Sequence, residues 1–148
     1  MQEKIPATAV MISSLLNYPR VLWGKFFSVL KPFEKQILTE ALRRLSDKEK
    51  DILIDQIKEI NCVQYVKGRN SSELNFYKLS LFKPIAYRNL KFESKDSIFK
   101  LLSLRFFLSK ENNYKNAKLY VINGNFFSIE CDFLIGSYRE KEDISFID

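Results

Sequence analysis

Three acidic residues at regular spacing are the first candidates for chemistry in this chain. Asp51, Asp55 and Glu59 recur at intervals of four, so a helix would place them on one face. Such a row could ligate a divalent cation, because hard cations prefer carboxylate oxygens. However, Lys48 and Lys58 lie nearby and no other oxygen ligand converges on the row. We therefore interpret the three acids as a solvated helix face and predict no metal site.

Other residue types that carry catalysis are scarce. The chain has no His and only two Cys, Cys62 and Cys131, which lie far apart. This excludes a zinc site of Cys and His within one chain and removes the commonest general base. Four glycines form neither a phosphate-binding loop nor a G-x-S-x-G motif. We predict a non-enzymatic protein without a cofactor, whose Cys residues are small buried apolar side chains in a reducing, cytoplasmic compartment.

A helical hairpin is predicted at 32–45 and 47–60, because apolar residues recur there at helical spacing. Pro32 suits the first turn of the first helix. Ser46 and Glu49 have the spacing of a capping box, in which each side chain bonds the backbone N–H of the other. Two further helices are predicted at 7–17 and 21–30, and no uncharged run is long enough to span a membrane.

A β-hairpin is predicted around Asn123-Gly124, because this dipeptide tolerates the positive φ angles of a tight turn. The return strand alternates strictly between apolar and polar residues, which indicates one buried and one wet face. Its apolar positions are Phe127, Ile129, Cys131 and Phe133. The register stays open: a two-residue turn pairs Tyr120 with Phe127, and a three-residue loop pairs Leu119 with Phe127.

The segment between these two hairpins is predicted to add strands and one helix. Alternating residues favour strands at 63–67, 74–82 and 85–93. Ser94 can cap a helix over 95–109, whose stripe is Ile98, Leu101, Leu102, Arg105 and Phe106.

At 148 residues with 46% hydrophobic content, the chain is long enough for one domain with its own core. The expected class is α+β, with N-terminal helices followed by a mostly antiparallel sheet of about five strands and one inserted helix. Residues 1–61 form the helical part, 62–136 the sheet with the 95–109 helix, and 137–148 an acidic tail, expected at an edge of the sheet or loosely docked.

The charge of the chain is unevenly distributed. The net charge is +6, yet residues 78–118 alone hold ten Lys or Arg against three acids, a net of +7. Such a basic region favours an acidic or polyanionic partner. We predict a partner-binding surface made of basic residues with aromatic anchors: Lys78, Lys83, Tyr87, Arg88, Lys91, Tyr114, Lys115 and Lys118.

Three kinds of partner fit these patterns. A protein partner is favoured. A nucleic acid could use the same basic, aromatic-rich surface, although the octamer typical of RNA-recognition motifs is absent. A membrane surface could bind the amphipathic segment containing Trp23, Phe26 and Phe27.

The hairpin segment V-I-N-G-N-F-F-S-I-E at 121–130 resembles strands of several bacterial toxin-immunity families. Abundant Phe, Ile, Lys, Asn and Tyr, which have A/T-rich codons, also suit a bacterial gene of this kind. The resemblance implies a cytoplasmic inhibitor that neutralises a cognate toxin by direct binding, and it transfers no functional residue. Inhibitors of nucleic-acid-cutting toxins are commonly acidic. This basic chain would therefore need a partner with an acidic surface, or would use its acidic tail.

Overall fold

The structure, a computed structural model, describes residues 19–21, 30–81, 83–86 and 90–148. Two helices, α2 (Pro32–Arg44) and α3 (Asp47–Glu59), precede most of an antiparallel sheet, so the predicted α+β class is confirmed. The described part has eight strands rather than about five, in the order β1-β2-β3-β7-β6-β5-β8 with β4 beside β3. They are β1 (Pro19–Val21), β2 (Cys62–Lys67), β3 (Ser72–Ser80), β4 (Lys83–Ile85), β5 (Ile98–Leu108), β6 (Asn113–Ile122), β7 (Asn125–Cys131) and β8 (Ile144–Ile147).

The predicted helical hairpin is confirmed. Pro32 lies at the start of α2, and the Ser46 hydroxyl accepts a hydrogen bond from the Glu49 backbone N–H at 3.3 Å. Glu49 accepts one in return from the Ser46 N–H at 3.1 Å, which completes the capping box. The helices predicted at 7–17 and 21–30 lie almost entirely outside the described residues. Val21 itself pairs with Cys62 at the end of β1.

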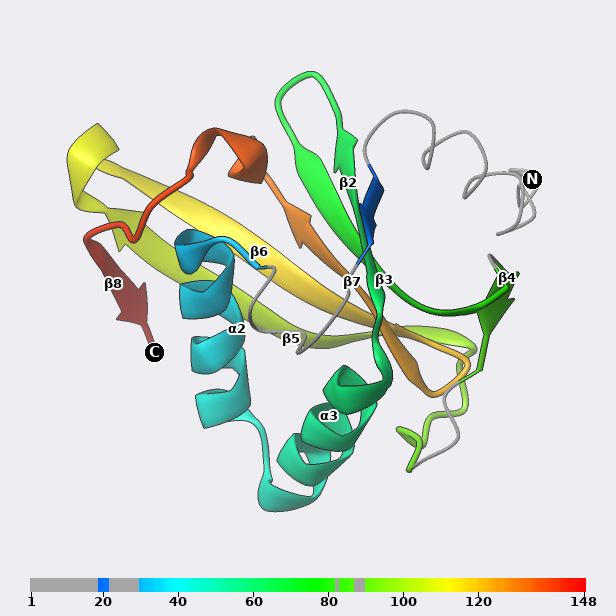
Figure 1. Cartoon of the computed structure of the whole chain (residues 1–148). Helices are drawn as coiled ribbons and strands as arrows, with labels where there is room; N and C mark the ends of the chain where they lie inside the picture. The colour runs from blue at the N-terminus through cyan, green and yellow to red at the C-terminus, as the bar shows by residue number, and fades with distance from the viewer. Residues whose placement is uncertain (1–18, 22–29, 82, 87–89) are drawn as a thin grey trace.

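Both helices pack on one face of the sheet, in front of it in Figure 1. The core between these layers is rich in fully buried phenylalanines, among them Phe33 of α2, Phe106 of β5 and Phe126 of β7. Burial of such rings is a major source of fold stability. Within the described residues, neither helix has the length and apolar character needed to cross a bilayer.

The β6–β7 hairpin turns at Asn123-Gly124 as predicted. Both residues have positive φ, 51° and 77°, and Ile122 pairs with Asn125 across the two-residue turn. The register then shifts at a bulge, and Tyr120 faces Ser128. Neither of the two predicted pairings occurs, because the bulge places one extra residue in β7 after a two-residue turn.

The helix predicted at 95–109 is wrong, because residues 98–108 form strand β5 between β6 and β8. The pattern also contains a period of two: Leu104, Phe106 and Leu108 face the core, whereas Ser103 and Arg105 are exposed. β6 pairs along the whole of this segment, and β8 pairs with its last four residues, Arg105–Leu108. Tertiary pairing therefore overrides the local helical stripe.

The strand predicted at 85–93 is also wrong in its extent. Strand β4 ends at Ile85, and the described residues from Leu90 to Glu93 form a loop. Pro84 lacks a backbone donor and suits the edge strand in which it lies. The strands predicted at 63–67 and 74–82 correspond to β2 and β3.

The acidic tail lies at the edge of the sheet, as expected, where β8 pairs with β5. Its approach is fixed by Gln36 of α2, whose side-chain amide donates to the Glu142 carbonyl and accepts from the Glu142 N–H, both at 2.9 Å. The Gln36 side-chain amide thus bonds the backbone of Glu142 as a neighbouring strand would, and these bonds hold the tail against α2.

Candidate functional site

The side of the sheet opposite the helices carries an exposed surface on β5 and β6. On β6, Ala117 and Leu119 face the core, so the intervening Lys118 points to the other side. Six residues of β5 and β6 point in this way to the side away from the helices, and we call the surface that they form the open face. They are Lys100, Ser103 and Arg105 of β5, and Tyr114, Asn116 and Lys118 of β6.

Cations and an aromatic ring contact each other on the open face. The Arg105 guanidinium lies 4.7 Å from the centre of the Tyr114 ring, and this ring packs edge-on against Phe107 at 5.3 Å. Tyr114 nevertheless remains 48% exposed. Arginine and tyrosine are the residue types that most often anchor protein interfaces. Stacking holds both side chains in place before a partner arrives, which reduces the entropy lost on binding.

Acidic residues border this face at the end of β7 and directly after it. Asp132 accepts hydrogen bonds from the Asn116 N–H at 2.9 Å and from the Asn116 side-chain amide at 2.7 Å. Glu130 lies directly opposite Lys118, which itself lies opposite Ser103. The surface therefore presents positive and negative groups at fixed positions rather than one sign of charge.

Of the six described residues among the eight predicted to bind a partner, Tyr114 and Lys118 lie on the open face. Lys78 is engaged within the protein: its ammonium contacts the Glu59 carboxylate at 2.5 Å and its side chain is only 17% exposed. Its role as a partner contact stays a prediction. Tyr87 and Arg88 lie outside the described residues.

Lys115 is also engaged within the protein. Its ammonium lies 2.9 Å from Glu111 and 5.8 Å from the centre of the Phe133 ring, on the helix side of the sheet. The Tyr138 hydroxyl donates to the same Glu111 carboxylate. The hydrogen bonds from Tyr138 and Lys115 lower the pKa of Glu111. Lys115 therefore supports the docking of the C-terminal segment, and its role as a partner contact stays a prediction.

The lowered pKa of Glu111 gives a pH-dependent prediction. A carboxyl group whose pKa is lowered by folding contributes stability above its unfolded pKa and loses it as the pH falls through the folded pKa. Tyr138→Phe removes the largest cause of the shift. In this variant, we expect the Glu111 carboxyl to titrate at a higher pH, as followed by NMR. We also expect the variant's free energy of unfolding to fall less steeply as the solution is made acidic. An unchanged Glu111 titration would contradict the assigned hydrogen bond.

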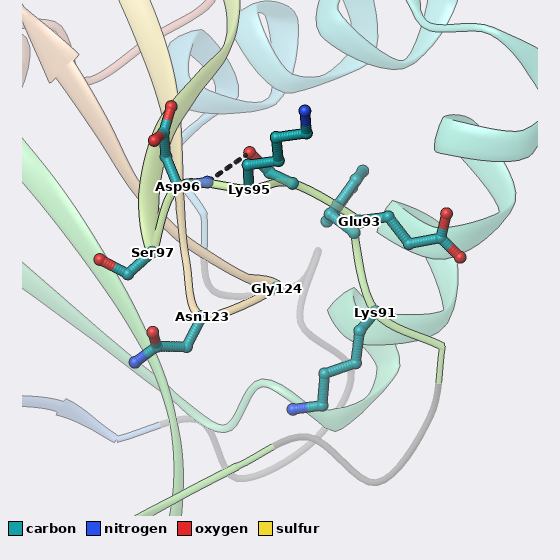
Figure 2. A pocket seen from close by; sticks show the side chains of 9 residues that line it. Lys91, Glu93, Lys95, Asp96, Ser97, Asn123 and Gly124 are labelled. Atoms are coloured by element: carbon teal, nitrogen blue, oxygen red, sulfur yellow. Dashed lines mark hydrogen bonds between the residues drawn. The ribbon is translucent and has the colours of Figure 1, made fainter.

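Lys83 and Lys91 are exposed but lie elsewhere, on β4 and on the loop after it. The loop at 91–97 and the turn at Asn123-Gly124 enclose a shallow hollow of about 470 Å³. Figure 2 shows that the side chains of Lys91, Lys95 and Asp96 point away from one another. No set of polar groups converges there, so the hollow is a weak candidate for a ligand site.

Two of the three carboxylates in the row on α3 are paired with lysines. Asp55 lies 3.7 Å from Lys58, and Glu59 pairs with Lys78. Among the described residues, no three His, Cys, Asp or Glu side chains are grouped as metal ligands. Cys62 and Cys131 are buried in strands, as predicted, and burial raises the pKa of the Cys62 thiol.

The sequence analysis missed Lys100, Ser103 and Arg105 because it placed them on a helix. The alternation from Leu102 to Leu108 was the signal that could have found them. In comparisons with known proteins, no family model, no curated protein and no solved structure matches this chain.

Proposed function

We propose that this chain is a non-enzymatic binding protein whose open face docks on another protein. The observation that carries the proposal is the Arg105–Tyr114 pair, which is held together yet exposed beside Lys118 on the side of the sheet away from the helices. Such a pair resembles the anchors of protein interfaces in residue type and in rigidity. We further propose that the partner is a bacterial toxin, and that the chain neutralises it by covering its active site or its substrate surface.

A protein partner is favoured over a nucleic acid by the charges that border the open face. Glu130 and Asp132 would repel the phosphates of a strand lying across β6 and β7. A protein surface can present a complementary pattern of both signs, and this complementarity gives specificity. The basic open face then requires an acidic patch on the partner.

A nucleic-acid-binding protein is the second candidate. Aromatic rings next to cations on an open sheet can stack with bases and contact phosphates, and Tyr114 with Arg105 and Lys100 has this composition. A strand confined to β5 and β6 would avoid most of the acidic border.

A pull-down of the tagged protein from its own cells, with nuclease added, separates the two candidates. One stoichiometric protein that survives nuclease and 0.5 M salt, and that is toxic when expressed alone but harmless with this chain, would support the inhibitor. A mixture of proteins that disappears with nuclease would contradict it and favour nucleic acid, whose binding weakens steeply with salt.

Variants of the open face test where the identified partner binds. We expect Arg105→Ala and Tyr114→Ala each to weaken binding by about 30-fold, because truncating an interface anchor typically costs about 2 kcal/mol. Lys83→Ala is the matched control, since Lys83 is equally exposed but lies on β4. Isothermal titration calorimetry measures all three. A larger loss for Lys83→Ala than for Arg105→Ala would contradict the assignment of the open face.

A further inference from the structure

Two carboxylates face each other on the side of the sheet that carries the open face. Glu73 of β3 lies directly opposite Glu130 of β7. Their neighbours Leu74 and Ile129 are buried in the core, so both acids point away from the helices. Glu73 is half-buried and Glu130 is exposed. Like charges directly opposite on neighbouring strands destabilise a sheet.

A buried acceptor lies next to this pair. Asn75 is two residues from Glu73 on the same face of β3 and is only 5% exposed. Its side-chain oxygen is buried and has no hydrogen-bond partner among the residues that the structure describes. Ser128, which lies opposite Asn75, gives its hydroxyl hydrogen bond to Glu73 instead. The cluster of Glu73, Glu130 and Asn75 therefore contains an excess of acceptors over donors.

In the described part of the chain, no cation pairs with the carboxylates of this cluster. Within residues 19–21, 30–81, 83–86 and 90–148, neither Glu73 nor Glu130 forms an ion pair, although Lys118 lies opposite Glu130 on the next strand. Burial, and then repulsion from Glu130, raise the pKa of Glu73. An arrangement that costs stability in the free state is typical of a site that is completed by a ligand.

A guanidinium group has the chemistry to complete it. It is always positively charged and presents five N–H donors in a planar fork. Carboxylates directly opposite on neighbouring strands start from Cβ atoms about 5 Å apart, so one fork can reach both. A remaining donor reaches the buried oxygen of Asn75 once the side chains that cover this oxygen move aside.

We propose that Glu73, Glu130 and Asn75 form a receptor for one arginine side chain of the protein partner. This inference rests on the proposed function, since it extends the footprint of the partner from the open face across β7 to β3. The partner would then present acidic groups to Arg105 and Lys118 and an arginine to Glu73. This pattern of both signs fixes the orientation of the complex.

Stability of the free protein gives the first test. We expect Glu73→Gln to raise the melting temperature at pH 7 by about 2 °C or more, because it removes a desolvated and repelled charge. The pKa of Glu73 is raised by folding, so its ionisation costs stability as the pH rises above the unfolded value. The gain should therefore disappear near pH 4.

Glu140→Gln is the control, because Glu140 is an exposed residue of the tail. A lower melting temperature for Glu73→Gln than for the wild type at pH 7 would overturn the inference.

Binding of a defined probe gives the second test. N-acetyl-arginine methylamide is titrated into the ¹⁵N-labelled full chain, and amide shifts are followed at residues 73, 75, 128 and 130. We expect saturable shifts in the wild type, at least tenfold weaker binding in Glu73→Gln, and no change in Glu140→Gln. Absence of saturable shifts, equal binding by Glu73→Gln, or saturation by calcium chloride in place of the arginine probe would overturn the arginine receptor.

The two proposals can fail separately. If the identified partner binds Glu73→Gln as tightly as the wild type but loses affinity with Arg105→Ala, the arginine receptor is wrong and the open face stands. If Arg105→Ala has no effect on partner binding, the proposed function itself is contradicted, whatever the arginine probe does.

Discussion

Replacing Gln56 with leucine is expected to lower the free energy of unfolding by about 3 kcal/mol or more. Gln56 of α3 is fully buried. Its side-chain amide donates to the carbonyls of Leu90 and Gly124, each at 2.9 Å, and its side-chain oxygen accepts from the Phe126 N–H at 2.7 Å. Leucine would remove the partner of the Phe126 N–H and of the Leu90 carbonyl, whereas the Gly124 carbonyl would keep its bond from the Phe92 N–H at 3.0 Å. Each unsatisfied buried group costs about 1–3 kcal/mol.

Gln56 matters because it joins three segments that are distant in the sequence: helix α3, the 90–97 loop and the β6–β7 turn. Urea denaturation of Gln56→Leu measures the loss. Gln36→Leu is the matched control, because Gln36 makes two hydrogen bonds to the edge segment at Glu142, where water can replace them. A loss for Gln56→Leu no larger than that for Gln36→Leu would contradict the assigned role.

Replacing Phe33 with alanine is expected to cost about 3–5 kcal/mol of unfolding free energy, the range for truncating a buried phenylalanine. Phe33 has no exposed surface, and its ring lies 6.0 Å from those of Phe106 and Phe133 and 4.8 Å from that of Tyr138. The cavity would open between α2, the sheet and the C-terminal segment, which are rigid elements that cannot all close it.

Thermal and chemical denaturation of Phe33→Ala test this prediction. Phe107→Ala provides the comparison, because the Phe107 ring is half-buried beside the open face and water can replace its contacts. We expect Phe107→Ala to lose less than half as much stability. Equal losses would show that the aromatic cluster around Phe33 is not the principal contact between the helices and the sheet.

Structure determined by neighbouring residues could be predicted from the sequence. The capping box of Ser46 and Glu49 and the turn at Asn123-Gly124 are formed by residues within a few positions of each other, and both are present. The bulge that places Tyr120 opposite Ser128 was not predictable in this way, because it depends on how β7 meets both β6 and β3.

Structure determined by distant residues was missed. Residues 98–108 carry both a helical stripe and an alternating pattern, and pairing with β6 and β8 decides between them. The residues of the predicted contact surface do not all lie on one face, for a related reason. Lys78 and Lys115 lie in the basic region of the sequence, but acids from α3 and from the β5–β6 connection neutralise them. Charge that is clustered in a sequence need not be clustered on a surface.

Hydroxyl-radical footprinting of the chain with and without its identified partner tests the central proposal most directly. Tyr114, 48% exposed on the open face, is compared with Leu81, which is 91% exposed next to β3. The proposal predicts that the partner strongly reduces oxidation of Tyr114 and leaves that of Leu81 unchanged. Protection of Leu81 with continued oxidation of Tyr114 would contradict it and place the binding surface away from β5 and β6.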